Sequence, residues 1–114
     1  MRRMTSGYSL DALTPGAFRD NLGGLFRLAV RPAPGGSPFS VDLRLADVAE
    51  HGKGSATFRA SFSVVFHGPL APILPQGIYR LEHDGLGALD LFIVPLGPDQ
   101  PSEPAAMRYE AVFG

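Results

Sequence analysis

The chain has 114 residues, with ten lysines and arginines against eleven aspartates and glutamates, so its formal net charge is −1. Apolar residues make up 45% of it, which is enough for one hydrophobic core and excludes global disorder. Because positive charge is not in excess, we expect no binding to nucleic acids or acidic membranes. The absence of cysteine excludes disulfide scaffolds, thiolate catalysis and thiolate metal sites.

The sequence shows no pattern typical of a targeting or membrane-spanning segment. The basic start, Met1–Gly7, is not followed by the apolar stretch of a signal peptide. The longest apolar run, Leu91–Leu96, is much shorter than the about 20 residues that a spanning helix needs. We therefore expect a cytoplasmic protein with a single domain over residues 1–114, in which residues 1–8 form a disordered tail.

One helix is predicted, near the start of the chain. Thr14 is a suitable N-cap, and Pro15 suits the first helical position, where a missing N–H costs nothing. Phe18 and Leu22 are four residues apart and are expected to share the face that packs on the core. The glycines at 23 and 24 predict the end of the helix.

Strands are predicted over the rest of the chain, separated by clusters of glycine and proline. Apolar and polar side chains alternate along them, which is typical of half-buried strands. The phase of the alternation changes after Leu45, so a β-bulge is expected near Ala46–Asp47. The six predicted strands cover residues 25–30, 39–49, 57–67, 77–83, 88–96 and 107–113.

Six consecutive strands without crossover helices predict antiparallel pairing. We expect an all-β fold, a small six-stranded antiparallel barrel or a two-layer sandwich, with one short N-terminal helix that plugs one end or covers a seam. For the hairpin formed by the predicted strands over residues 77–83 and 88–96, we predict a register that pairs Leu81 with Leu91 and Tyr79 with Ile93. The other register considered pairs Leu81 with Asp90 and places an unpaired carboxylate in the core.

Patterns for catalysis or metal binding are weak. Glu82, His83 and Asp84 are consecutive, but neighbouring residues of a regular strand point to opposite faces and cannot meet at one site. The three histidines lack short ligand spacings, and no serine lies in a nucleophile motif. We therefore expect no enzymatic activity, no cofactor and no bound metal.

Two groups of residues are candidates for binding. The first is an outward-facing surface that combines charged side chains with two apolar ones predicted beside Arg80 and Glu82; it consists of Arg80, Glu82, Phe92, Val94, Arg108 and Glu110. If their strands are neighbours, the charged residues pair across strands; a merely solvated face is the alternative. The helix, the 31–38 loop or a second chain would cover Phe92 and Val94. The second group, a candidate barrel mouth, consists of Tyr79, His83 and Tyr109.

A series of short motifs runs through the second half of the chain: Pro75-Gln76-Gly77-x-Tyr79-Arg80-Leu81-Glu82-His83, then Leu86-Gly87, Leu89-x-Leu91-Phe92-x-Val94-Pro95-x-Gly97 and Tyr109-Glu110-Ala111-Val112-Phe113. With these motifs, residues 62–113 resemble a family of small bacterial domains of unknown function. The resemblance implies no activity. It suggests a small adaptor, because some members are encoded beside collar or fibre proteins of phage-tail-like particles.

Together, these observations predict a non-catalytic protein-binding or assembly module, an accessory of a phage-tail-like particle. Its partner would be a component of such a particle or a second copy of the chain. The alternative is a barrel that binds a small ligand at one mouth.

Overall fold

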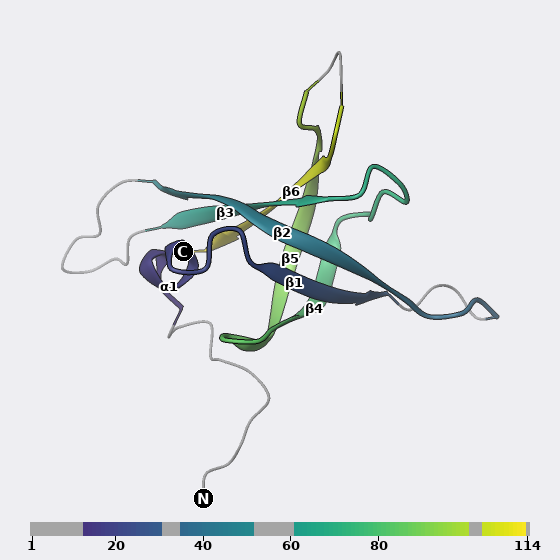
Figure 1. Cartoon of the computed structure of the whole chain (residues 1–114), viewed down its shortest axis with the longest axis horizontal. Helices are drawn as coiled ribbons and strands as arrows, with labels where there is room; N and C mark the ends of the chain where they lie inside the picture. The colour runs from purple at the N-terminus through teal and green to yellow at the C-terminus, as the bar shows by residue number, and fades with distance from the viewer. Residues whose placement is uncertain (1–12, 31–34, 52–60, 101–103, 114) are drawn as a thin grey trace, which may run out of the picture.

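A computed structural model describes residues 13–30, 35–51, 61–100 and 104–113 (Figure 1). In chain order, its elements are α1 (Pro15–Arg19), β1 (Leu25–Val30), β2 (Phe39–Glu50), β3 (Phe62–Gly68), β4 (Gly77–His83), β5 (Gly87–Pro98) and β6 (Met107–Phe113). In these segments, no helix has the length and apolar character needed to cross a membrane.

The six strands form a closed barrel in the order β1-β2-β3-β6-β5-β4, and every neighbouring pair is antiparallel. The predicted all-β barrel with one short helix is therefore confirmed, and the sandwich alternative is not formed. Three predicted strands have the observed bounds, and β2 and β5 extend slightly further than predicted. The predicted start of the third strand, residues 57–60, and the predicted tail, residues 1–8, lie outside the described residues.

The core is built by the alternation of inward-facing apolar and outward-facing polar side chains along the strands. On each strand, every second side chain points into the barrel, as the sequence predicted. The bulge is also present, because the register changes from Leu45↔Phe66 to Asp47↔Val65 and leaves Ala46 as the extra residue. The largest fully buried side chains from the strands are Phe26, Leu28, Leu43, Leu45, Phe62, Val64, Phe66, Leu81, Leu89, Ile93 and Tyr109.

Helix α1 closes one end of the barrel. The side chain of Thr14 accepts a hydrogen bond from the N–H of Ala17 and caps the helix, as predicted. The ring of Phe18 is fully buried and lies 5.3 Å from that of Phe113 and 6.0 Å from that of Phe62. A five-residue helix is unstable alone, so this aromatic contact holds it. Figure 1 shows α1 beside the C-terminal end of β6.

The prediction that Leu22 packs on the core with Phe18 is wrong. The helix ends at Arg19, so a residue four positions after Phe18 is no longer on the same helical face. The chain turns instead, with Gly23 at φ +85°, and the N–H of Gly23 donates to the carbonyl of Leu45 on β2. The side chain of Leu22 is consequently 49% exposed.

The predicted register of the β4–β5 hairpin is also wrong. The structure pairs Leu81 with Leu89 and Tyr79 with Leu91, two positions from the prediction. A shift of two keeps the same residues inside, so face parity could not distinguish the two registers. The turn determines the register. His83 pairs with Gly87, and Gly87 adopts the left-handed conformation, φ +78°, which lets the chain reverse direction over the three residues between them.

Replacing Phe18 with alanine should remove most of the contact between α1 and the barrel. We expect Phe18→Ala to lower the free energy of unfolding by about 3–5 kcal/mol, because a buried ring is lost and a cavity is left. Leu22→Ala, at an exposed position, should change it by less than about 0.5 kcal/mol. Urea unfolding followed by circular dichroism measures both, and equal effects of the two variants would contradict the assignment.

Candidate functional site

The four charged residues of the predicted surface do not lie on neighbouring strands. Arg80 and Glu82 are on β4 and Arg108 and Glu110 are on β6, and β5 separates the two strands. Cross-strand pairs between them are therefore not formed. Arg80 instead binds its register partner Asp90 through two hydrogen bonds of 3.0 and 3.1 Å. These bonds lower the pKa of Asp90 from its ordinary value.

On the other side of the barrel, Arg108 belongs to a row of basic side chains that the sequence analysis did not identify. Arg44, His67 and Arg108 are consecutive register partners across β2, β3 and β6. The Nε atom of Arg108 is buried and has no hydrogen-bond partner in the described part of the chain. Asp42 and Asp99 line the hollow of about 440 Å³ beside Arg44 and His67, so the charge of this region is mixed.

The predicted barrel mouth is not a single site. The hydroxyl of Tyr109 accepts a hydrogen bond from the N–H of Leu74 at 2.9 Å, and the hydroxyl of Tyr79 donates to the carbonyl of Pro75 at 2.6 Å. The two tyrosines thus hold the connection between β3 and β4. Burial, and secondarily Tyr109, raises the pKa of Tyr79 above 10.0. His83 lies at the opposite end of β4.

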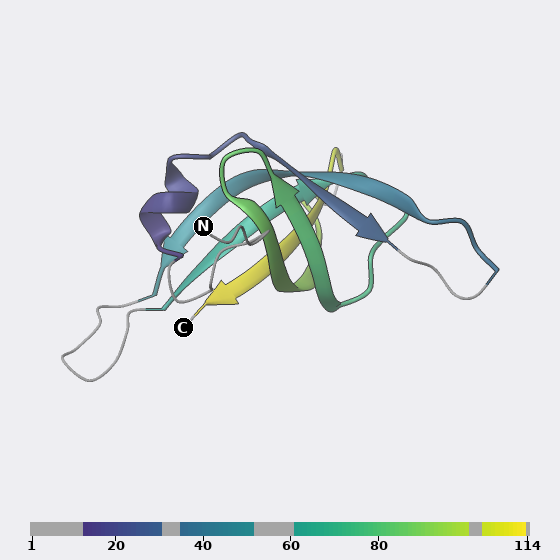
Figure 2. The same cartoon turned by 90° about the horizontal axis from the view of Figure 1, so that it is seen from below.

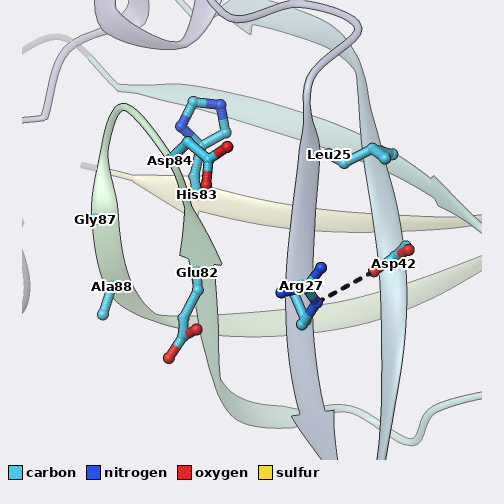
Figure 3. A pocket seen from close by; sticks show the side chains of 8 residues that line it. All are labelled: Leu25, Arg27, Asp42, Glu82, His83, Asp84, Gly87 and Ala88. Atoms are coloured by element: carbon cyan, nitrogen blue, oxygen red, sulfur yellow. Dashed lines mark ion pairs between the residues drawn. The ribbon is translucent and has the colours of Figure 1, made fainter.

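His83 organises the β4–β5 turn. Its Nδ1 atom accepts hydrogen bonds from the N–H groups of Gly85, at 3.0 Å, and Leu86, at 2.9 Å. Its ring stacks on Phe26 with a centroid distance of 4.4 Å. A hollow of about 500 Å³ lies beside it (Figure 3). In that view the carboxylate of Glu82 points away from the His83 ring, so these two side chains do not form an acid–base pair.

Exposed apolar side chains gather at the other end of β4. A hollow of about 530 Å³ is lined by residues from the end of β1, the start of β2, the β3–β4 connection and the start of β4: Ala29, Val30, Phe39, Pro72, Ile73, Leu74, Pro75, Ile78, Tyr79 and Arg80. Ile78 is 74% exposed and Ile73 is 58% exposed. We call Phe39, Ile73, Ile78 and Phe92, with Pro72 and Pro75, the apolar surface.

Phe92 faces outward as predicted and is 51% exposed, but its neighbour is different from the expected one. The register places Phe92 opposite Ile78, and Val94 opposite Glu110. The expectation that Phe92 and Val94 lie beside Arg80 and Glu82 was wrong because the register was two positions off. Helix α1 packs against β2 and β3, so it does not cover Phe92. Sequence reasoning missed Ile73, Ile78 and Phe39, which the barrel brings to the same region.

Comparison with known families matches residues 13–113 to a domain of unknown function, DUF6916. The chain belongs to the DUF6916 family. The match includes the first half of the chain, whereas the motifs that carry the resemblance described above lie in residues 62–113. The comparisons with curated proteins and with solved structures give no match.

In this DUF6916 domain, the two backbone bonds accepted by His83 can be tested by substitution. His83→Ala and His83→Asn both lose the ring that stacks on Phe26, but asparagine keeps an acceptor near the position of Nδ1. We expect His83→Asn to be more stable than His83→Ala by about 1 kcal/mol in urea unfolding, since alanine leaves two donors without an acceptor. Equal stabilities would show that the turn does not depend on this acceptor.

The hydrogen bonds accepted by the Asp99 carboxylate can be tested by the pH dependence of stability. Its Oδ1 atom accepts hydrogen bonds from the N–H groups of Gln100, Ala105 and Ala106, and the bonds from Ala105 and Ala106 are the main reason that its pKa lies below 3.8. A carboxylate with a depressed pKa stabilises the fold above its unfolded pKa, and the effect is lost as pH falls through the folded pKa.

The stability difference between the wild type and Asp99→Ala should therefore be constant at neutral pH and shrink as the pH falls below about 4. Urea unfolding over a pH series measures it. Asp84→Ala removes one exposed carboxylate that accepts no hydrogen bond from the described residues, and it controls for the change in net charge. A difference that grows toward acidic pH would contradict the assignment.

Proposed function

We propose that the domain is a non-catalytic protein-binding module that docks through the apolar surface. The observation that carries the proposal is the pair of exposed side chains Ile78 and Phe92, which are register partners on β4 and β5. A contiguous group of exposed large apolar side chains beside a hollow is typical of a protein interaction site.

The energetics of this surface support docking. Covering apolar area releases about 25 cal/mol per Å², and Ile73, Ile78 and Phe92 all keep more than half of their surface exposed. Pro72 and Pro75 form part of the wall, and their fixed φ angles reduce the conformational entropy that a partner would have to remove. The surface is therefore largely shaped before a partner arrives.

The partner class follows from the resemblance described above. The resemblance suggests that some members are encoded beside phage-tail-like components, so we propose that the bound protein is a component of such a particle and that the domain serves its assembly. A second copy of the chain is the other partner considered. The apolar surface would serve either role, and the experiment below separates them.

The alternative, a barrel that binds a small ligand, has less support. Positions inside the barrel are filled by side chains such as Phe66, Leu81 and Tyr109, which are at most 1% exposed. The hydroxyls of Tyr79 and Tyr109 are engaged by the β3–β4 connection, and His83 lies at the other end of the barrel. We therefore favour docking on the outside.

The test uses the tagged chain as bait in a lysate of its native host. Ile78→Ser combined with Phe92→Ser should reduce recovery of the specific partner at least tenfold, because loss of about 1.4 kcal/mol already weakens binding tenfold. Leu25→Ser is the matched control, since Leu25 is 57% exposed and lies at the start of β1, where it lines the other two hollows and not the one beside the apolar surface.

Circular dichroism and urea unfolding establish that both variants remain folded. Quantitative mass spectrometry identifies the partner, and light scattering on the pure protein shows whether it self-associates. Unchanged recovery with the double variant would contradict the proposed docking surface. Equal losses with the double variant and with Leu25→Ser would also contradict it.

A further inference from the structure

Three side chains that can donate hydrogen bonds to an anion lie in one row on the outside of the barrel. Arg44 of β2 is the register partner of His67 of β3, and His67 is the register partner of Arg108 of β6. Each of the three is flanked along its strand by buried residues, so all three side chains point outward. Figure 2 shows β2, β3 and β6 side by side. We call these three residues the basic row; the Cα atoms of its two arginines are about 10 Å apart, because two strand spacings separate them.

The described part of the chain supplies no acceptor for the side chains of the basic row. No side-chain hydrogen bond or ion pair joins Arg44, His67 or Arg108 to another described residue. The Nε atom of Arg108 is buried without a partner there, and a buried donor without an acceptor is rare and costly in a native fold. Because the guanidinium of Arg108 makes no hydrogen bond to these residues, turning it toward His67 breaks none.

The carboxylates near the basic row have other partners or are not bonded to it. The Oδ1 atom of Asp42 lies 3.8 Å from the Nε atom of Arg27, and Oδ1 of Asp99 accepts three backbone N–H groups. Glu110 is two positions from Arg108 on β6, but no ion pair joins these two described residues. An anion from outside the chain would therefore supply acceptors that the described residues do not.

A hollow of about 440 Å³ lies against the basic row. Its lining includes Arg44 and His67, and also Ala106, which is two positions before Arg108. The two aspartates named above line the same hollow. Sites for small molecules have volumes of about 300–1,000 Å³, so the hollow is large enough for one. It combines donors for an anion with carboxylates that can accept hydrogen bonds from hydroxyl groups.

We propose that the basic row binds the phosphate group of a small phosphate monoester, and that the hydroxyl groups of the same molecule lie against the carboxylates of the hollow. A phosphate monoester carries three strong acceptor oxygens and a charge of about −1.5 to −2, so it can accept from two arginines and one histidine together. A carboxylate has two oxygens, which one arginine can occupy in bidentate form, and it would leave part of the row unused. The site shares no residue with the apolar surface, so the two can be tested separately.

The test titrates the intact, isotope-labelled chain with glycerol phosphate, with inorganic phosphate and with glycerol. Sodium chloride keeps the ionic strength constant, because salt screens exposed charges. NMR follows the Nε–H signals of Arg44 and Arg108 and the ring signals of His67. Arg44→Gln and Arg108→Gln each remove one guanidinium from the row. Arg80→Gln is the matched control, since Arg80 is an arginine on β4 that is bound to Asp90.

If the proposal holds, glycerol phosphate shifts the signals of the basic row in a saturable way, and glycerol alone does not. Inorganic phosphate should bind more weakly than glycerol phosphate, since it lacks the hydroxyl groups that contact the hollow. Each glutamine variant of the row should bind about tenfold more weakly or worse, because a charge-assisted hydrogen-bond pair is lost. Arg80→Gln should bind as the wild type does.

Circular dichroism and urea unfolding establish that the variants are folded. Arg44 is exposed, so Arg44→Gln provides the result even if Arg108→Gln is unstable. Shifts that never saturate, or an equal loss with Arg80→Gln, would indicate general ionic attraction and overturn the proposal. Equal affinities for glycerol phosphate and inorganic phosphate would overturn the monoester as the ligand class.

Discussion

The barrel depends on its closure between β1 and β4. Leu28 and Leu81 are register partners at this seam, and both side chains are fully buried, so one inward pair joins the first strand to the fourth. Closure removes the long sheet edges that an open six-stranded sheet would expose. Because only two pairs of residues join the strands there, the two ends of the seam are lined by other parts of the chain. The side chains at these two ends differ in their contacts.

At one end of the seam, the ring of His83 stacks on Phe26 and its Nδ1 atom holds the β4–β5 turn. Contacts within the chain fill this end. At the other end, the side chains of Ile78 and Ile73 face solvent beside the hollow. The same closure therefore yields one end that is filled by contacts within the chain and one end that leaves large apolar side chains exposed.

Much of the fold was predictable from the sequence because alternation decides which side chains point inward. The strand bounds, the bulge after Leu45 and the outward direction of Phe92 all follow from it. Alternation fixes a register only to within a shift of two residues, which is why the predicted partner of Leu81 was wrong. The deciding information lay in the turn, where Gly87 and His83 set the loop length.

The neighbours of the site residues could not be predicted, because they depend on strand order. Arg80 and Arg108 have the same parity, but β5 lies between their strands. The order also brings His67 between Arg44 and Arg108 and places the end of β1 near the start of β4. No local pattern encodes these contacts, since the residues are far apart in the chain.

The hydroxyl of Tyr109 ties the interior of the barrel to the outer wall of the hollow. Its ring is buried in the core, and its oxygen holds the backbone of Leu74, between Ile73 and Pro75. The shape of the hollow therefore depends on a side chain that is itself buried in the core. Replacing Tyr109 with phenylalanine would keep the ring in the core but remove the acceptor of the Leu74 N–H, so a single buried atom couples the packing of the interior to the outline of the hollow.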